Sequence, residues 1–175
     1  MAEAERDGAP PLSVVDLGSG AGVPGLVLAV RWHASSFLLV DAHQRRAAFL
    51  LGAIRRLELA GRVVAVAERA ETLGRTPQKR GRYDLVTARG FGRPAVAAEC
   101  AAPFLRAGGL LVVSEPPPAV TAGHARWPAE RLAELGMGPA RSTGSSYRFA
   151  AVTQEQLCPD RFPRRVGVPS KRPLF

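Results

Sequence analysis

The chain has 175 residues, 46% of them hydrophobic and 6% aromatic, which is long enough for one well-buried domain and short for two. No apolar run reaches the roughly 20 residues of a membrane span, and the polar first residues lack a signal-peptide pattern, so we expect a cytoplasmic protein without membrane contact. The 24 Lys and Arg exceed the 15 Asp and Glu, and the resulting charge of +9 favours an anionic partner, although an arginine-rich composition can also reflect genomic base bias. The spacing of Cys100 and Cys158 does not fit a metal site, which predicts reduced thiols and no metal.

The most informative stretch is 13–25. A short apolar run at 14–17 is followed by glycines at alternate positions, Gly18, Gly20 and Gly22, and then by a helical apolar spacing. This pattern predicts a strand, a tight turn and a helix, the first unit of a doubly wound α/β fold, in which ligands bind at the carboxyl ends of the strands. The spacing fits neither the dinucleotide fingerprint, whose third glycine would fall on Val23, nor a phosphate-binding P-loop.

Asp16 and the three glycines together resemble the first motif of the S-adenosylmethionine (SAM) dependent methyltransferases of the Rossmann-like class. In that class the glycines let the backbone approach the methionine half of SAM. The alternative is a glycine-rich turn that binds no ligand. A second strand, 36–40, ends in Asp41, 23 residues after Gly18. An acidic side chain at this place can accept both ribose hydroxyls of a nucleoside, or it can simply cap the next helix.

Strands and helices continue to alternate, so we expect a mostly parallel sheet. A helix at about 44–59 precedes a third strand at 63–67, whose end, 68–71, would pass beside the adenine ring of SAM. A fourth strand at 84–88, a helix at about 94–105 and a fifth strand at 110–113 follow. A short helix after Trp127 and a hairpin around 144–145, with its second strand at 147–152, complete an α/β, Rossmann-like fold with a C-terminal antiparallel hairpin.

The last segment, 159–175, is a basic tail rich in proline. From position 161 onward it holds three prolines, no acidic residue and five basic residues, Arg161, Arg164, Arg165, Lys171 and Arg172. We predict an extended backbone whose charges can follow phosphates; a solvated tail without a specific partner is the alternative. The predicted organisation is therefore a disordered lead at 1–11, a methyltransferase domain at 12–158 and this tail.

Four segments together resemble a single family. They are Asp-Leu-Gly-Ser-Gly-Ala-Gly-Val-Pro-Gly-Leu at 16–26, Arg-Ala-Glu at 69–71, Thr-Ala-Arg at 87–89 and Phe-Pro-Arg-Arg-Val-Gly-Val-Pro-Ser-Lys-Arg-Pro-Leu at 162–174. Over nearly its whole length the chain resembles the bacterial 16S ribosomal RNA guanine-N7 methyltransferases, also called glucose-inhibited division protein B. The resemblance implies SAM as cofactor and 16S ribosomal RNA or the small ribosomal subunit as partner. It also implies SAM contacts at Gly18, Val23, Ala70, Glu71 and Arg89.

The reaction that the resemblance implies needs few acids or bases. Guanine N7 carries a free lone pair and no proton, so methyl transfer requires in-line placement and exclusion of water but no general base. Arg89 would lie near the reacting groups as the catalytic residue. Basic side chains can hold the target nucleotide by its phosphate or by stacking, and the tail offers Arg164, Arg165, Lys171 and Arg172. We expect a monomer.

Two features differ from the family pattern. Family members usually begin with a helical segment before the first strand, whereas here the first strand begins near residue 13, and Ser114-Glu115 stands where the family tends to have Lys-Gly. A carboxylate at that rim would repel phosphate. Two alternative functions therefore stay open: methylation of a small molecule or another RNA by a short divergent paralogue, and a module that binds SAM or RNA without turnover.

Overall fold

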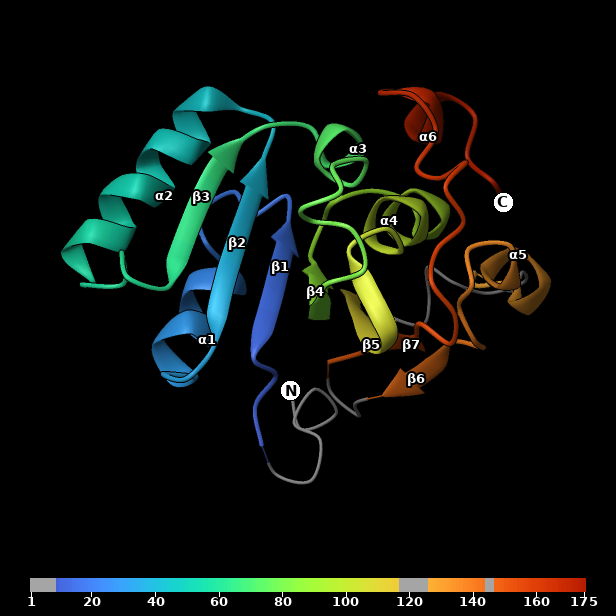
Figure 1. Ribbon diagram of the computed structural model, residues 1–175, viewed down its shortest axis with the longest axis horizontal. Helices are drawn as coiled ribbons and strands as arrows, with labels where there is room; N and C mark the ends of the chain where they lie inside the picture. Colours follow the sequence, from blue (N-terminus) through green and yellow to red (C-terminus); the bar gives the residue numbers. More distant parts are fainter. Residues whose placement is uncertain (1–8, 117–125, 144–146) are drawn as a thin grey trace.

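The computed structural model describes residues 9–116, 126–143 and 147–175. In this part of the chain a mixed sheet carries helices on both faces (Figure 1). The elements are, in chain order, β1 (Ser13–Leu17), α1 (Gly25–Arg31), β2 (Ser36–Asp41), α2 (Gln44–Arg56), β3 (Val63–Ala67), α3 (Ala70–Leu73), β4 (Tyr83–Ala88), α4 (Pro94–Ala101), β5 (Leu105–Ser114), α5 (Ala129–Ala133), β6 (Arg141–Thr143), β7 (Phe149–Thr153) and α6 (Val168–Lys171).

The strand order is β3-β2-β1-β4-β5-β7-β6. Strands β1 to β5 are parallel, whereas β7 is antiparallel to both β5 and β6. The predicted doubly wound sheet with a C-terminal antiparallel hairpin is therefore confirmed. Because the chain runs outward from β1 in one direction and then restarts at β4, the carboxyl ends of β1 and β4 flank the point where such folds bind ligands.

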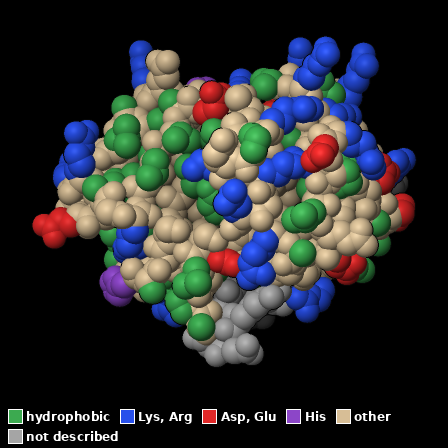
Figure 2. All heavy atoms as spheres, in the orientation of Figure 1, with side chains coloured by type: hydrophobic (Ala, Val, Ile, Leu, Met, Phe, Trp, Pro, Cys, Tyr) green, Lys and Arg blue, Asp and Glu red, His purple; other side chains and the backbone are tan. Residues whose placement is uncertain are grey.

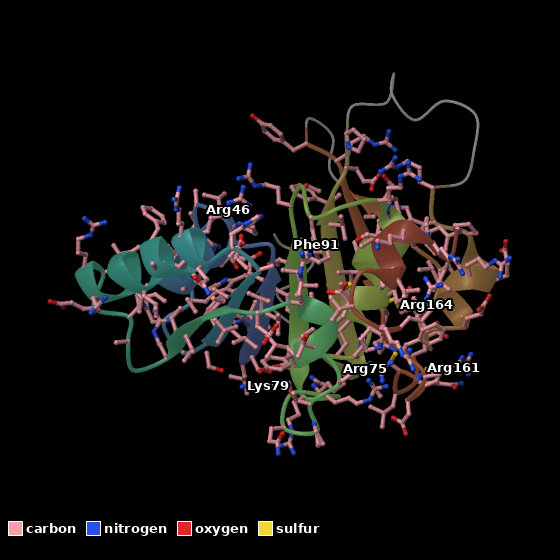
Figure 3. The ribbon with its side chains drawn as sticks, turned by 90° about the horizontal axis from the view of Figure 1, so that it is seen from above. Arg46, Arg75, Lys79, Phe91, Arg161 and Arg164 are labelled. Carbon is pink, nitrogen blue, oxygen red and sulfur yellow. The ribbon has the colours of Figure 1, made fainter. Side chains whose placement is uncertain are left out.

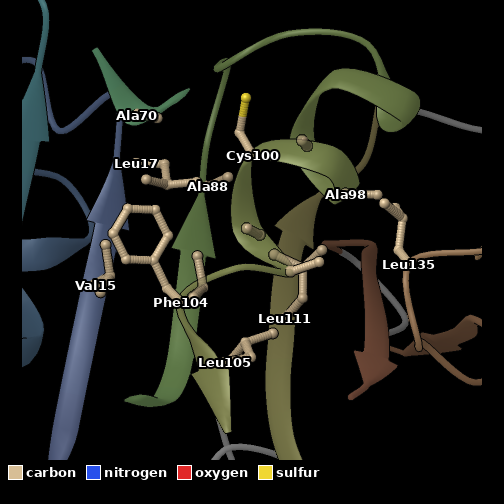
Figure 4. Packing of buried hydrophobic residues seen from close by; sticks show 14 of the residues in the cluster. Val15, Leu17, Ala70, Ala88, Ala98, Cys100, Phe104, Leu105, Leu111 and Leu135 are labelled. Atoms are coloured by element: carbon tan, nitrogen blue, oxygen red, sulfur yellow. The ribbon is translucent and has the colours of Figure 1, made fainter. Parts of the chain in front are cut away.

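Alternating side chains of the buried strands face two separate hydrophobic layers. On one face, Val14 and Leu39 pack in a cluster with residues of α1 and α2. On the other, Val15, Leu17 and Phe104 pack with residues of α3, α4 and α5 (Figure 4). Both layers consist mainly of apolar side chains, and the few buried polar side chains include Asp16 in β1, Thr87 in β4 and Glu99 in α4.

Two boundaries differ from the predictions. Helix α4 ends at Ala101, and β5 already begins at Leu105 because Leu105 pairs with Tyr83 of β4. The pairing of the two strands then shifts its register, which the glycines at 108–109 accommodate. Strand β7 was expected at 147–152 and instead runs from Phe149 to Thr153; residues 150–152 are all buried because β7 lies between β5 and β6. The turn expected at 144–145 lies outside the described residues.

The C-terminal tail is folded onto the domain. Phe162 and Pro163 are buried, and α6 packs against α4. The root of the tail is fixed by Arg80, whose guanidinium donates hydrogen bonds to the carbonyl oxygens of Cys158, Pro159 and Phe162 at 2.6 to 2.8 Å. The prediction of an extended tail is therefore wrong over 168–171, because side-chain hydrogen bonds and apolar burial fold the segment back. Residues 1–8 of the expected lead lie outside the described residues.

Candidate functional site

The glycine turn after β1 is tied to the end of β2. The backbone N–H groups of Gly18 and Ser19 both donate to the carbonyl oxygen of Val40, at 2.8 and 3.0 Å. Gly18 has a φ of +68°, and a Cβ there would lie 2.9 Å from Cδ2 of Phe91. Glycine is therefore required both by the backbone conformation and by the close approach of the aromatic ring. The result is a stretch of bare backbone at the edge of the sheet.

Asp41, at the end of β2, has a carboxylate that is only 3% exposed. Its Oδ2 accepts a hydrogen bond from the N–H of Gly20 at 3.0 Å, and its Oδ1 accepts one from the N–H of His43 at 2.9 Å. The second bond shapes the entry into α2, which is close to the capping role weighed as an alternative. Each carboxylate oxygen keeps a further lone-pair site, so the same side chain can also accept hydroxyl groups of a ligand.

Asp16 is 1% exposed and joins β1 to its neighbours. Its Oδ1 accepts a hydrogen bond from Oγ1 of Thr87 at 2.6 Å, and its Oδ2 accepts one from the N–H of Gly25 at 3.2 Å. Burial raises the pKa of this carboxyl to about 6, and the hydrogen bonds from Thr87, Ser19 and Gly25 oppose that rise. Asp16 therefore fixes the start of α1 beneath the glycine turn.

A pocket opens at the carboxyl ends of β1, β2 and β3, with about 450 Å³ of space, part of it open to solvent. Four of the predicted site residues line it: Gly18, Asp41, Ala70 and Glu71. The predicted residues that its lining does not include are Asp16, Gly20, Gly22, Val23 and Arg89. The first three of these lie in or under the turn that forms one side of the pocket.

Sequence reasoning missed several apolar members of the pocket wall, among them Val40, Phe91 and Val96. Phe91 lies near the centre of the sheet edge from which the loops rise, between Arg46 on one side and Arg164 on the other (Figure 3). Its only sequence signal is an aromatic residue two positions after Arg89. An apolar wall with a few carboxylates and backbone groups suits a nucleoside, which has flat apolar faces and hydroxyl groups.

Arg89 follows β4 and is exposed. Its Nε donates a hydrogen bond to the carbonyl oxygen of Val23 at 3.1 Å, which connects the loop after β4 to the loop after β1. The structure thus brings Arg89 and Val23 together beside the pocket. Both side chains remain accessible to a large partner that approaches this edge of the sheet.

The four tail residues predicted to contact RNA fall into two groups. Arg165, Lys171 and Arg172 are exposed, and Lys and Arg side chains gather over α6 and its surroundings (Figure 2). Arg164 instead forms an ion pair of 2.6 Å with Glu99, a fully buried residue of α4. This carboxylate raises the pKa of Arg164. The only sequence signal for the pair is an acidic residue within the apolar run of α4.

The carboxylate of Glu115, which was expected to repel phosphate, is paired with neighbouring side chains. Its Oε2 accepts a hydrogen bond from Nε of Arg126 at 2.7 Å, its Oε1 accepts one from Nε1 of Trp127 at 3.1 Å, and its side chain is 10% exposed. The charge of Glu115 is therefore paired and turned away from bulk solvent, which weakens the expected repulsion of phosphate at this rim.

Neither a membrane span nor a metal site is found in 9–116, 126–143 and 147–175. No helix among these residues combines the length and apolar character needed to cross a membrane. No group of three or more His, Cys, Asp or Glu side chains among them is arranged to hold a metal ion.

The fold is similar to that of solved methyltransferase structures. A SAM-dependent O-methyltransferase from Thermotoga maritima superposes with a TM-score of 0.61 at 12% sequence identity, covering 84% of this chain and 60% of that one. A predicted O-methyltransferase from Agrobacterium tumefaciens gives a TM-score of 0.60 at 17% identity, covering 81% of this chain and 73% of that one. At these identities the likeness establishes the fold alone.

Sequence comparison gives the family. A family model described as GidB, rRNA small subunit methyltransferase G, matches residues 2–115. Ribosomal RNA small subunit methyltransferase G of Deinococcus deserti is 40% identical over 167 residues, which cover 93% of this chain and 68% of the relative. The protein of the same name from Thermotoga sp. (strain RQ2) is 36% identical, with 93% of this chain and 72% of the relative covered. The chain therefore belongs to the GidB family, the rRNA small subunit methyltransferases G.

Proposed function

We propose that this protein transfers a methyl group from SAM to N7 of a guanine in 16S ribosomal RNA. The observation that carries the proposal is the pocket at the ends of β1, β2 and β3, in which the glycine turn, Asp41 and the segment 68–71 meet, in a chain whose family acts on ribosomal RNA. A monomer catalyses this methyl transfer in the cytoplasm, with either the naked RNA or the small ribosomal subunit as substrate.

The residues of the pocket fit SAM. Gly18 presents backbone without a side chain and can lie against the methionine half, and Asp41 has lone pairs left for two ribose hydroxyls. Ala70 and Glu71 stand at the end of β3, where an apolar surface and an acceptor suit an adenine ring and its amino group. Asp16, Gly20, Gly22 and Val23 support this arrangement from the turn. When bound, SAM supplies an electrophilic methyl group.

The protein's own task is to place the guanine and exclude water. N7 attacks with its free lone pair, so no proton has to be removed and no side chain needs to act as a base. Arg89, exposed beside the mouth of the pocket, is our candidate for holding the target nucleotide by its phosphate or its base face. Arg165, Lys171 and Arg172 bind the flanking RNA backbone.

The pairing of Glu115 weakens the argument for the alternative substrates. That residue was the reason to doubt a phosphate-bearing substrate, and its carboxylate is neutralised by Arg126. A module that only binds SAM or RNA would not need an exposed arginine next to this pocket. We therefore favour the ribosomal RNA reaction over both alternatives.

The test is methyl transfer in vitro. Labelled SAM is incubated with small subunits, or with 16S RNA, from cells that lack this protein, and the RNA is digested to nucleosides. We expect the label in 7-methylguanosine. Label in another nucleoside, or unlabelled RNA with a preparation that binds SAM, would contradict the assignment.

A matched pair of variants addresses the role of Arg89. We expect Arg89→Ala to lower the turnover rate while SAM affinity, measured by calorimetry, stays unchanged. Arg45→Ala, which removes an exposed arginine from α2, serves as the control and should behave as the wild type. Equal turnover by both variants would exclude Arg89 from the reaction.

A further inference from the structure

The C-terminal helix α6 forms one side of the candidate SAM pocket. Ser170, in this helix, lines the pocket together with Glu71 of α3 and Cys100 of α4. Figure 1 shows α6 next to α3 and above α4, although the segments that carry Glu71 and Gly167 are 96 positions apart in the chain. A four-residue helix has little intrinsic stability, so its place depends on what holds it.

Two buried carboxylates hold α6 in this place. Glu71, which is 5% exposed, accepts a hydrogen bond from the backbone N–H of Gly167 at 3.0 Å, just before the helix. Glu99 accepts three hydrogen bonds from Arg164: one from its backbone N–H at 2.8 Å, one from Nε at 2.9 Å and one from Nη2 at 2.6 Å.

The same guanidinium also binds the far end of the helix. Nη2 of Arg164 donates to the carbonyl oxygen of Arg172 at 2.8 Å, one residue after α6 ends. Arg164 thus connects the start of the segment, its end and the buried Glu99. The planar fork of an arginine can make this set of contacts, whereas the single ammonium of a lysine cannot.

Loss of this guanidinium would leave the buried charge of Glu99 without its hydrogen-bonded partner. A carboxylate in that state draws in water or rearranges, because an unpaired charge is costly in a low-dielectric interior. Both responses separate α6 from α4. The pocket would then lose its fixed wall while the sheet, the glycine turn and Asp41 stayed in place.

We infer that Arg164 is a positioning residue for the SAM site: through Glu99 it holds α6, and with it Ser170, as a wall against the bound cofactor. The inference rests on the proposed function, in that the pocket holds SAM. It also removes Arg164 from the residues that face RNA. The exposed Arg165, Lys171 and Arg172 lie in the segment that Arg164 fixes to α4. The position of this segment therefore determines both the wall of the SAM site and the surface that contacts phosphate.

The first test compares Arg164→Ala with Arg75→Ala, which removes an exposed arginine from the loop after α3. We expect Arg164→Ala to raise the Kd for SAM, measured by calorimetry, by about tenfold, the equivalent of roughly one charge-assisted hydrogen bond. The KM for SAM should rise in parallel, while kcat at saturating SAM stays within about twofold. Arg75→Ala should match the wild type, and Arg164→Lys should fall between the two. An unchanged Kd in a folded Arg164→Ala protein would overturn the inference.

A second variant covers the case in which Arg164→Ala does not fold. Ser170 is exposed and lines the pocket, so Ser170→Trp should leave the melting temperature unchanged and obstruct the SAM site. We expect a rise in the Kd for SAM of at least about tenfold. A Ser170→Trp protein that binds SAM as tightly as the wild type would refute the placement of α6. Failure of the wild type itself to bind SAM would instead refute the proposed function, and the inference with it.

Discussion

Replacing Asp41 by alanine tests whether one carboxylate serves both the fold and the cofactor. The change removes hydrogen bonds to the N–H groups of Gly20 and His43. Hydrogen bonds to a charged group contribute about 1.5 to 3 kcal/mol each. Gly20 is half-buried and His43 is exposed, so both donors regain water. We therefore expect the free energy of unfolding to fall by about 2 kcal/mol rather than by the full sum.

The effect on SAM should be larger. Two ribose hydroxyls would lose a charged acceptor in a pocket where Asp41 is 3% exposed. A loss of about 3 kcal/mol corresponds to a Kd for SAM that is roughly 100-fold higher. Denaturant titration measures the first quantity and calorimetry the second. Glu130→Ala, which removes an exposed carboxylate from α5, is the control for both.

The two measurements distinguish the roles of Asp41. A loss of stability with an unchanged Kd would mean that the carboxylate only shapes the turn and the start of α2. A higher Kd with unchanged stability would mean that it acts on the cofactor alone. Unchanged values for both would refute the reasoning entirely.

Three further variants test other parts of the site. Burial raises the pKa of Asp16 in the folded protein from 3.8 to about 6. The contribution of this carboxyl to the free energy of unfolding is therefore fully present below about pH 4 and falls by about 3 kcal/mol as the pH rises through 6. Asp16→Asn should remove this pH dependence from the free energy of unfolding measured by denaturant titration. Gly18→Ala should lower the free energy of unfolding by about 1 to 2 kcal/mol because of the positive φ at this position. The added Cβ should also press on Phe91 and weaken SAM binding measured by calorimetry. In a Phe91→Ala background the loss of SAM binding should diminish, whereas the loss of stability should remain. Arg80→Ala should release the tail to early cleavage in limited proteolysis, and an unchanged digestion pattern would show that other contacts hold it.

Much of the fold could be predicted because its signals are local. The apolar runs of β1, β2, β3 and β4 are short and end at glycine or charged residues, which is the pattern of strands buried on both faces. The alternation of strands and helices then leaves a parallel sheet as the simplest arrangement. The errors lie where tertiary pairing decides the bounds: β5 begins five residues early, through pairing of Leu105 with Tyr83, and β7 runs from Phe149 to Thr153, where it pairs with β5 and β6, rather than over 147–152.

The site was predictable to a smaller extent. Gly18 and Asp41 carry their signals in sequence, because a turn after one strand and an acid after the next meet at the same edge of the sheet. Phe91 reaches the pocket from the loop after β4 and Ser170 from helix α6, and the sequence around them does not mark either residue as part of the site. The ion pair between Glu99 and Arg164 joins residues 65 positions apart. A basic tail has the same composition whether its arginines face phosphate or a buried carboxylate.

The net charge of +9 therefore overstates what the chain offers to RNA. Several guanidinium groups are used internally. Among them, Arg62 donates to the carbonyl oxygens of Trp32 and Ser35, Arg80 holds the root of the tail, and Arg164 pairs with Glu99.

Exposed cations at or near the pocket include Arg69, Arg89, Arg165, Lys171 and Arg172, and the last four are our candidates for contact with RNA. If these four make the phosphate contacts, the logarithm of the RNA affinity should fall with the logarithm of the salt concentration with a slope of about −3 to −4, since each contact contributes roughly −0.7 to −0.9. Filter binding over a salt series gives the slope. Removing the charge of Lys171 should reduce the magnitude of this slope by about one unit. A wild-type slope near −8 would mean that a much wider surface meets the RNA, and that the division between internal and RNA-facing arginines is wrong.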